Sequence, residues 1–127
     1  MIQTELTRLL GVRHPIVCAP MAGWSGGGLA GAVSRGGGFG MIGVGGSSPP
    51  DFIREQADLA RKTANDRPFG IGLMTWAVEK RPELLDAVLA TKPAAVSLSF
   101  GDPAPFAEQV RGAGVLLFSQ VQNRERA

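Results

Sequence analysis

Few side chains in this sequence could serve as a catalytic acid, base or nucleophile, or as a metal ligand. The chain has one histidine, His14, and one cysteine, Cys18, so it can supply neither a Ser-His-Asp set nor paired metal ligands. His14 precedes the first predicted strand and is interpreted as a solvated or capping residue at the amino-terminal end of the sheet. Cys18 lies among apolar neighbours and is predicted to be a buried, unreactive thiol. The sequence therefore predicts neither a nucleophilic triad nor a metal site.

Glycines can bring bare backbone close to a ligand, and the sequence matches the pattern G-x-G-x-x-G twice. Residues 26–31 follow a predicted strand and open a predicted helix, as in a dinucleotide site, whereas residues 38–43 lie inside a strand. A dinucleotide site also needs an acidic residue at the end of the second strand, and residues 44–48 contain none. The dinucleotide interpretation is therefore weak. Residues 26–28 and 45–46 stay open to two interpretations, a ligand-facing backbone or plain turns.

Polar, aromatic and sulfur-containing side chains follow three later strands, near their carboxyl ends. Such side chains suit a flat ring and its polar atoms, although Trp76 is interpreted as packing and Asp102 as a helix cap. Parallel α/β sheets bind ligands at the carboxyl ends of their strands, so this edge is the expected binding side. The residues are Met74, Thr75 and Trp76; Ser97, Ser99, Phe100, Gly101 and Asp102; and Ser119, Gln120 and Gln122.

Short apolar runs alternate with helical periodicity along the chain. No hairpin signal occurs, so the pattern predicts a parallel sheet built by right-handed crossovers. Residues 48–51 (SPPD) are predicted to form a capping box at the start of one helix. An open doubly wound sheet and a closed (β/α)8 barrel both use this pattern, and the barrel typically needs about 250 residues. Strands are expected at 16–19, 39–44, 69–74, 95–100 and 115–121, and helices at 4–10, 28–34, 49–63, 82–90 and 103–111.

The composition indicates an ordinary globular chain of one domain. Of the 127 residues, 44% are hydrophobic and 19% are charged, and the net charge of +2 comes with no basic cluster that would favour nucleic acid. No apolar stretch reaches membrane-spanning length, and the amino terminus lacks the charged and apolar regions of a signal peptide. With its single cysteine, the sequence predicts a cytoplasmic protein that has no membrane partner and no internal disulfide.

Four segments resemble the nitronate monooxygenases, formerly called 2-nitropropane dioxygenases. They are residues 15–23 (PIVCAPMAG), 32–40 (AVSRGGGFG), 67–73 (RPFGIGL) and 99–103 (SFGDP). The resemblance implies an α/β fold of the parallel (β/α)8 TIM-barrel type, in preference to the open sheet. It also implies that residues 1–127 are the N-terminal part of a single flavin-binding barrel domain, with about five strands and four helices.

The same resemblance implies FMN as the cofactor, a nitronate or nitroalkane as the substrate, and oxygen as the electron acceptor. Gly72 stands where the family commonly has an asparagine that contacts the cofactor, so the sequence departs from the family there. The family's catalytic histidine on the sixth strand and its flavin-phosphate loops after strands seven and eight have no counterpart, so no catalytic residue is assigned. The residues implied to bind the cofactor are Ala19, Pro20, Met21, Ala22, Gly23, Gly72 and Gln120.

Two other functions remain open. A flavin-dependent enoyl-thioester (enoyl-ACP) reductase shares the front half of the barrel, and a truncated, non-catalytic half-barrel is the alternative that is not an enzyme. As the front half of an oxidoreductase, the 127 residues alone are expected to be inactive. A half-barrel also leaves parallel strand edges unpaired, so self-association through those edges is predicted.

Overall fold

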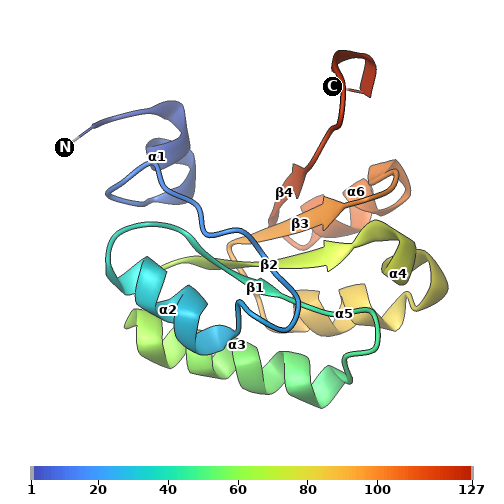
Figure 1. The fold of residues 1–127 in the computed structure, drawn as a ribbon, viewed down its shortest axis with the longest axis horizontal. Coiled ribbons are helices and arrows are strands. Elements are labelled where there is room, and N and C mark those ends of the chain that lie inside the picture. Colours follow the sequence, from blue (N-terminus) through green and yellow to red (C-terminus); the bar gives the residue numbers. More distant parts are fainter. Residues whose placement is uncertain (1, 127) are drawn as a thin grey trace.

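The computed structural model describes residues 2–126 and contains one sheet of four parallel strands with helices between them (Figure 1). The strands are β1 (Gly40–Gly43), β2 (Phe69–Met74), β3 (Ala95–Ser99) and β4 (Leu116–Ser119). The helices are α1 (Glu5–Leu10), α2 (Gly27–Arg35), α3 (Pro50–Ala64), α4 (Thr75–Lys80), α5 (Glu83–Ala90) and α6 (Ala104–Gly112), followed by a short 3-10 helix, η1 (Arg124–Arg126). Among the described residues, no helix is long and apolar enough to cross a membrane.

The spatial order of the strands, β1-β2-β3-β4, is the order in which they occur along the chain. Helices α2, α3 and α5 cover one side of the sheet (Figure 1), and Val110 of α6 belongs to the core on that side. An open doubly wound sheet instead reverses its strand order and carries helices on both faces. Sequential parallel strands with helices on one side are the arrangement found in the wall of a (β/α)8 barrel. The structure therefore agrees with the predicted barrel type.

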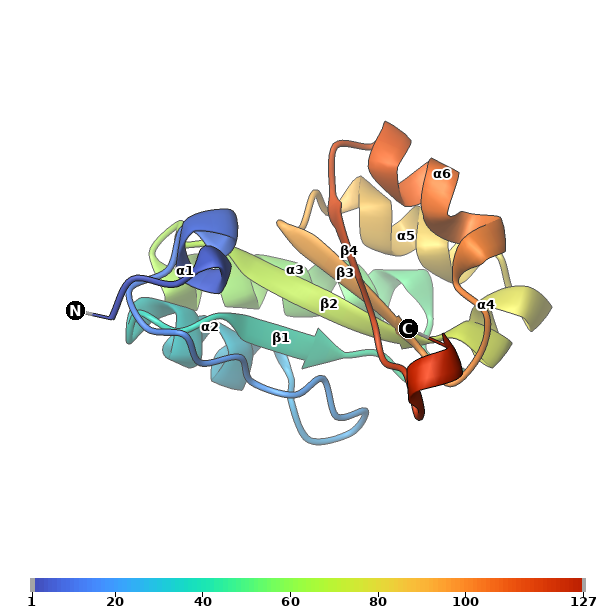
Figure 2. The same cartoon turned by 90° about the horizontal axis from the view of Figure 1, so that it is seen from above.

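The first predicted strand, residues 16–19, is reduced to one bridge at the edge of the sheet. Val17 pairs with Phe39; the Cys18 N–H donates to the Phe39 oxygen (2.9 Å), and the Phe39 N–H donates to the Ile16 oxygen (2.8 Å). Figure 2 shows this segment running beside β1. Ile16 is 60% exposed and Cys18 is half-buried, so the predictions of a buried strand and a buried thiol are wrong. The reason is that, within residues 2–126, no strand pairs with the outer edge of this segment.

The sheet separates two clusters of buried apolar side chains. The larger cluster lies between the sheet and its helices and includes Ile42 and Ile71 from neighbouring strands. The smaller cluster lies on the opposite face, where Met41 packs with Phe39 and with Leu10 of α1. Successive side chains of a strand point to opposite faces, which is why Met41 and Ile42 belong to different clusters. This face, which α2, α3 and α5 leave uncovered and on which α1 packs, corresponds to the interior of a barrel.

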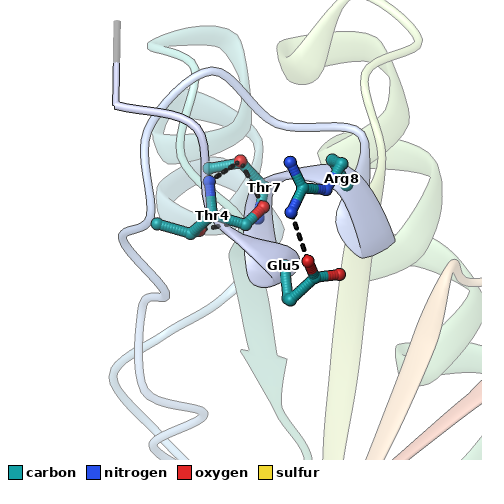
Figure 3. Close-up of polar contacts among 4 residues, drawn as sticks. All are labelled: Thr4, Glu5, Thr7 and Arg8. Atoms are coloured by element: carbon teal, nitrogen blue, oxygen red, sulfur yellow. Dashed lines mark hydrogen bonds and ion pairs between the residues drawn. The ribbon is translucent and has the colours of Figure 1, made fainter.

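Helix α1 is fixed by local hydrogen bonds at its start (Figure 3). The Thr7 N–H donates to Thr4 Oγ1 (3.2 Å) and the Thr4 N–H donates to Thr7 Oγ1 (2.9 Å), which makes a reciprocal capping box. Arg8 forms an exposed ion pair with Glu5 on the same helix. Gly11 ends the helix in the left-handed conformation, with φ of 64°. These contacts define both ends of the helix that packs on the smaller cluster.

Three helix starts differ from the prediction. Helix α3 begins at Pro50 with Pro49 as its N-cap and no side-chain cap bond, so the capping box predicted at residues 48–51 is wrong. The backbone oxygen of Ser48 instead accepts a hydrogen bond from Arg81 (3.4 Å). Helix α4 is missing from the prediction because it starts directly after β2 and has no side-chain cap to mark its first turn. The N-cap of α6 is Pro103, so the prediction of Asp102 as the cap is wrong by one residue, although Asp102 Oδ1 accepts the Ala104 N–H (2.9 Å) just before the helix.

Candidate functional site

A cavity of about 570 Å³ opens at the carboxyl ends of the strands, on the sheet face opposite the helices. Its volume lies within the range of natural small-molecule sites. Six of the seven residues predicted to bind the cofactor line it, namely Ala19, Pro20, Met21, Ala22, Gly72 and Gln120. The seventh, Gly23, lies outside the lining, in a turn where its φ is 82°. The other lining residues are Val17, Met41, Gly43, Val44, Leu73, Met74, Ser97, Ser99, Phe100 and Phe118.

The floor of the cavity depends on two glycines that are neighbours across the sheet. Gly43 of β1 and Gly72 of β2 are register partners. A Cβ added to Gly43 would lie 2.3 Å from the Met21 carbonyl carbon, so the backbone of the preceding loop rests directly on this strand. A Cβ added to Gly72 would lie 2.4 Å from the Cβ of Pro20, so the proline ring fills the space of the missing side chain. The two glycines therefore let the loop at residues 20–22 lie flat across the sheet.

Ser25, a residue that the sequence analysis does not single out, ties this loop to β1. Its hydroxyl oxygen accepts the Met21 N–H (2.6 Å) and donates to the Met21 oxygen (3.2 Å). The Gly43 N–H donates to the Ser25 backbone oxygen (2.8 Å). Ser25 is 1% exposed, so these bonds are shielded from water and hold the loop in one position. A serine four residues after the loop methionine, within a glycine-rich turn, is too common a pattern to have revealed this role.

The cavity is polar at only three side chains. Among the described residues that line it, the polar side chains are Ser97, Ser99 and Gln120, and none of the lining side chains is ionisable. Ser97 pairs in register with Gly72 on one side and with Phe118 on the other, so its hydroxyl lies in the same row as the glycine floor. The site therefore has neutral hydrogen-bonding groups set among apolar walls. It carries no side chain that could act as a general base.

Several other strand-end residues do not line the cavity, namely Thr75, Trp76, Gly101, Asp102, Ser119 and Gln122. Trp76 packs on Gly46, where an added Cβ would lie 3.2 Å from its ring, in agreement with the predicted packing role. The Thr75 hydroxyl is buried with no hydrogen-bond partner among the described residues, and its side chain packs against Gly101. His14 is exposed and lies beside Gly37, which comes just before β1. It is therefore at the amino-terminal end, as predicted.

The first glycine motif, residues 26–31, serves helix packing. A Cβ added to Gly27 would lie 2.1 Å from the Gln56 backbone oxygen of α3, and one added to Gly31 would lie 2.6 Å from the Thr63 Cβ. The Gly27 N–H donates to Gln56 Oε1 (2.8 Å), so a helix side chain, rather than a ligand, satisfies this donor. Gly27 and Gly31 are one helical turn apart, on the same face of α2. The packing of α2 on α3 therefore explains these glycines without a bound nucleotide.

Arg81 holds the loop that follows β1 beside the cavity. Its Nη1 donates to the backbone oxygens of Gly46 (2.8 Å) and Ser48 (3.4 Å), and its Nε donates to Glu83 Oε1 (2.8 Å). The hydrogen bond from Arg81 lowers the pKa of the exposed Glu83 carboxyl below its ordinary value. Together with Trp76, Arg81 explains why Gly45 and Gly46 belong to a packed loop; Gly45 and Gly46 do not line the cavity.

A second cavity of about 560 Å³ lies in the outer helix layer, between α3 and α5. It is lined by charged residues, but its arginines take part in structural contacts. Arg61 donates to the Thr91 oxygen (2.5 Å), and Arg54 pairs with the Asp51 carboxylate (2.8 Å). Catalytic sites of barrel folds lie instead at the carboxyl ends of the strands. The cavity on the inner face is therefore the candidate site.

Comparison with known proteins shows which family the chain resembles. The nitronate monooxygenase profile matches residues 3–111. A nitronate monooxygenase from Pseudomonas aeruginosa is 35% identical, in a match that covers 84% of this chain and 40% of that protein. A (3aS,4S,5R,7aS)-5-hydroxy-7a-methyl-1-oxo-octahydro-1H-indene-4-carboxyl-CoA dehydrogenase from Rhodococcus jostii is 25% identical, over 94% of this chain and 33% of that protein. The chain thus spans 40% or less of the length of these two relatives.

Solved structures extend the similarity to the fold. FabK from Thermotoga maritima superposes with a TM-score of 0.89 at 29% identity, covering 99% of this chain and 40% of that chain. A nitroalkane oxidase from Streptomyces ansochromogenes superposes with a TM-score of 0.75 at 28% identity, covering 97% of this chain and 44% of that chain. The predicted barrel type is confirmed, and enzymes of the matched family depend on flavin. On the profile match and the Pseudomonas aeruginosa relative together, the chain belongs to the nitronate monooxygenase family.

Proposed function

We propose that this chain forms the flavin-binding front part of an FMN-dependent oxidoreductase that oxidises nitronates with oxygen. The observation that carries the proposal is the cavity on the inner face. It lies at the carboxyl ends of parallel strands in a chain of the nitronate monooxygenase family, and six residues predicted to bind FMN line it. Residues 19–22 supply one wall, Gly72 belongs to β2, and Gln120 directly follows β4.

The residues present fit the ring system of a flavin. A flat heteroaromatic ring needs an apolar bed and a few neutral hydrogen-bonding groups, and the cavity supplies both through Met21, Met74 and Phe118 and through its three polar side chains. The cavity is less suited to the phosphate of FMN, because none of its described lining residues carries a positive charge. The proposed role of this chain is therefore to hold the ring, and these side chains offer the phosphate no ion pair.

The chemistry follows from this division of roles. When bound, a flavin accepts an electron pair from the substrate and passes it to oxygen. The residues of this chain would position the ring, exclude water and leave an apolar space for the substrate. They offer no base, and a nitronate is already deprotonated, whereas a neutral nitroalkane must first lose a proton to a base. A nitronate therefore needs no base from these residues, although its negative charge also meets no cation among the described lining residues.

A second candidate is a flavin-dependent enzyme that acts on an acyl thioester. The Rhodococcus jostii relative is named as a carboxyl-CoA dehydrogenase, so the similarity extends to an enzyme of thioester chemistry. The cavity also has exposed apolar side chains at its margin, Met21 (44% exposed) and Phe100 (60% exposed), which would suit an acyl chain. Turnover of an enoyl thioester with a nicotinamide donor, without turnover of a nitronate, would favour this candidate.

The experiment that tests the proposal compares two flavins that differ only in the phosphate. The purified chain is titrated with FMN and with riboflavin, and binding is followed by quenching of flavin fluorescence and by co-elution in gel filtration. We expect both flavins to bind with comparable affinity, since the cavity contacts the ring and offers the phosphate no cation. If neither FMN nor riboflavin binds, the proposal is wrong. Much tighter binding of FMN would contradict the assignment of the ring alone to this cavity.

A further inference from the structure

Two hydroxyls lie side by side on the wall of the cavity. Ser97 and Ser99 are alternate residues of β3, so both side chains point to the inner face. Both line the cavity; Ser97 is 8% exposed and Ser99 is half-buried. Their hydroxyl oxygens are 3.4 Å apart. The next strand adds Gln120, which follows Ser119, the register partner of Leu98.

The hydrogen-bonding capacity of this pair is largely unused within the described chain. The other two buried serines are fully engaged with backbone. Ser25 bonds both the N–H and the oxygen of Met21, and Ser34 donates to the Pro68 oxygen (2.8 Å) while it accepts the Gly40 N–H (3.0 Å). Ser97 and Ser99 share a single long contact, although each hydroxyl can donate once and accept twice. Buried hydroxyls are normally satisfied, so a buried Ser97 whose one long contact is to another cavity-lining hydroxyl points to a ligand at this wall.

The surroundings of the pair define the chemistry of that ligand. Ser97 lies between Gly72 and Phe118 in register, and Met74 pairs with Ser99. The lining holds no ionisable side chain, so a phosphate or a carboxylate would lack a counter-charge here. Neutral hydroxyls instead suit the carbonyl oxygens and ring nitrogens of a heterocycle that lies on an apolar surface. Those groups are found at the pyrimidine edge of a flavin.

We infer that Ser97 and Ser99 form a hydrogen-bonding pair for the pyrimidine edge of the bound flavin, and so act as positioning residues for the ring. The inference rests on the proposed function, because it takes the flavin to be the occupant of the cavity. The pair supplies directional contacts that the backbone at residues 20–22 and the apolar walls do not give. It also bears on the electron affinity of the ring, since hydrogen bonds to the flavin edge are one way in which a protein tunes the cofactor.

The test uses Ser97→Ala, Ser99→Ala and the double variant, with Ser119→Ala as a matched control. Ser119 is a strand serine outside the cavity, and its hydroxyl already donates to the Leu98 oxygen (3.0 Å). Flavin affinity is measured by fluorescence quenching, and the midpoint potential of the bound flavin by spectroscopic titration. We expect each single variant to weaken binding about 5-fold and the double variant about 30-fold, with a shifted potential. Ser119→Ala should leave both readouts unchanged, and Ser99→Thr should restore them.

The other outcomes distinguish failure of the inference from failure of the proposed function. If the wild-type chain binds no flavin, the proposed function fails and the inference fails with it. If the wild type binds and the double variant binds equally well with an unchanged potential, only the inference fails. A normal flavin affinity and potential with weaker binding of a nitronate to the flavin-loaded chain would assign the pair to the substrate instead. Should Ser97→Ala unfold the chain by circular dichroism, the half-buried Ser99→Ala decides by the same measurements.

Discussion

Two pairs of glycines lie within one sheet-and-helix layer of this protein and do different things. Gly27 and Gly31 belong to a literal nucleotide-binding pattern, yet they let α2 pack directly against the backbone of α3. Gly43 ends the second match to that pattern, at residues 38–43 inside a strand, and with Gly72 it forms the floor on which residues 20–22 lie. The pair placed like a nucleotide-binding turn is structural, and the pair that lies within two strands shapes the candidate site.

The difference comes from what surrounds each pair, because glycine only removes a side chain and permits a close approach. In α2 the approaching group is a neighbouring helix, whose Gln56 also takes the Gly27 N–H. On β1 and β2 the approaching group is a loop at the carboxyl end of the sheet, beside the cavity. The two pairs should therefore respond to the same substitution with different defects, one in folding and one in flavin binding.

The largest expected effect is that of Gly27→Ala on stability. The new methyl would lie 2.1 Å from the Gln56 backbone oxygen, so α2 and α3 would have to separate. We expect the free energy of unfolding to fall by about 3 kcal/mol, at the upper end of the usual range for overpacking. Urea denaturation followed by circular dichroism measures it. Gly28→Ala is the matched control, because a Cβ there meets nothing within 4 Å and alanine favours a helix.

Gly43→Ala should impair flavin binding as well as stability. Its methyl would collide with the Met21 carbonyl carbon at 2.3 Å and lift the loop from the sheet. We expect a loss of about 2 kcal/mol in stability and a loss of flavin affinity of at least about 10-fold in the folded fraction. Fluorescence titration below the denaturation midpoint tests this. Gly45→Ala, where the nearest atom is at an ordinary 3.5 Å, should bind flavin normally. Unchanged affinity in Gly43→Ala would remove the proposed contrast between the two pairs.

The sequence predicts the inner strands of the sheet better than the segment at its edge and the short helix α4. The runs expected at 69–74 and 95–100 become β2 and β3 almost without change, because short and mostly apolar runs between helical segments mark the strands of a parallel sheet. The same reasoning fails at residues 16–19. Whether a second strand pairs with the outer edge of this segment cannot be seen in an apolar run, and within the described chain none does. Helix α4 is missed because its start carries no capping signal.

For the candidate site, the resemblance to a family identifies residues that the pattern alone does not. Ala19, Pro20, Met21 and Ala22 line the cavity together with Gly72 and Gln120, although their binding of flavin stays a prediction. The absence of a side chain at Gly72 has a physical reason, because the Pro20 ring occupies that space. Ser25 and Gly43 are missed, since their roles arise from strand register and from a loop that folds back, neither of which has a local sequence signal.

Ser25→Ala should sharpen the contrast on the cavity side. The substitution removes the hydroxyl that bonds both backbone groups of Met21 and leaves the Met21 N–H without this partner. We expect a loss of about 1.5 kcal/mol in stability, with weaker flavin binding because the loop gains freedom above Gly43. Hydrogen exchange at the Met21 amide measures the local loosening. Ser34→Ala is a suitable control, since it breaks hydrogen bonds of a buried serine that does not line the cavity. It should lower stability without changing flavin affinity.

Gln56→Ala gives the smallest expected effect and tests the packing side. Its side-chain oxygen accepts the Gly27 N–H, which belongs to the first turn of α2, where amide groups lack partners within the helix. Removing it should lower the free energy of unfolding by about 1 kcal/mol, the usual value of such a cap, because water can partly replace the lost acceptor. Flavin affinity should not change, since Gln56 does not line the cavity. A clear loss of flavin binding in this variant would mean that the α2 amino terminus takes part in the site after all. The division between a packing pair and a binding pair would then be wrong.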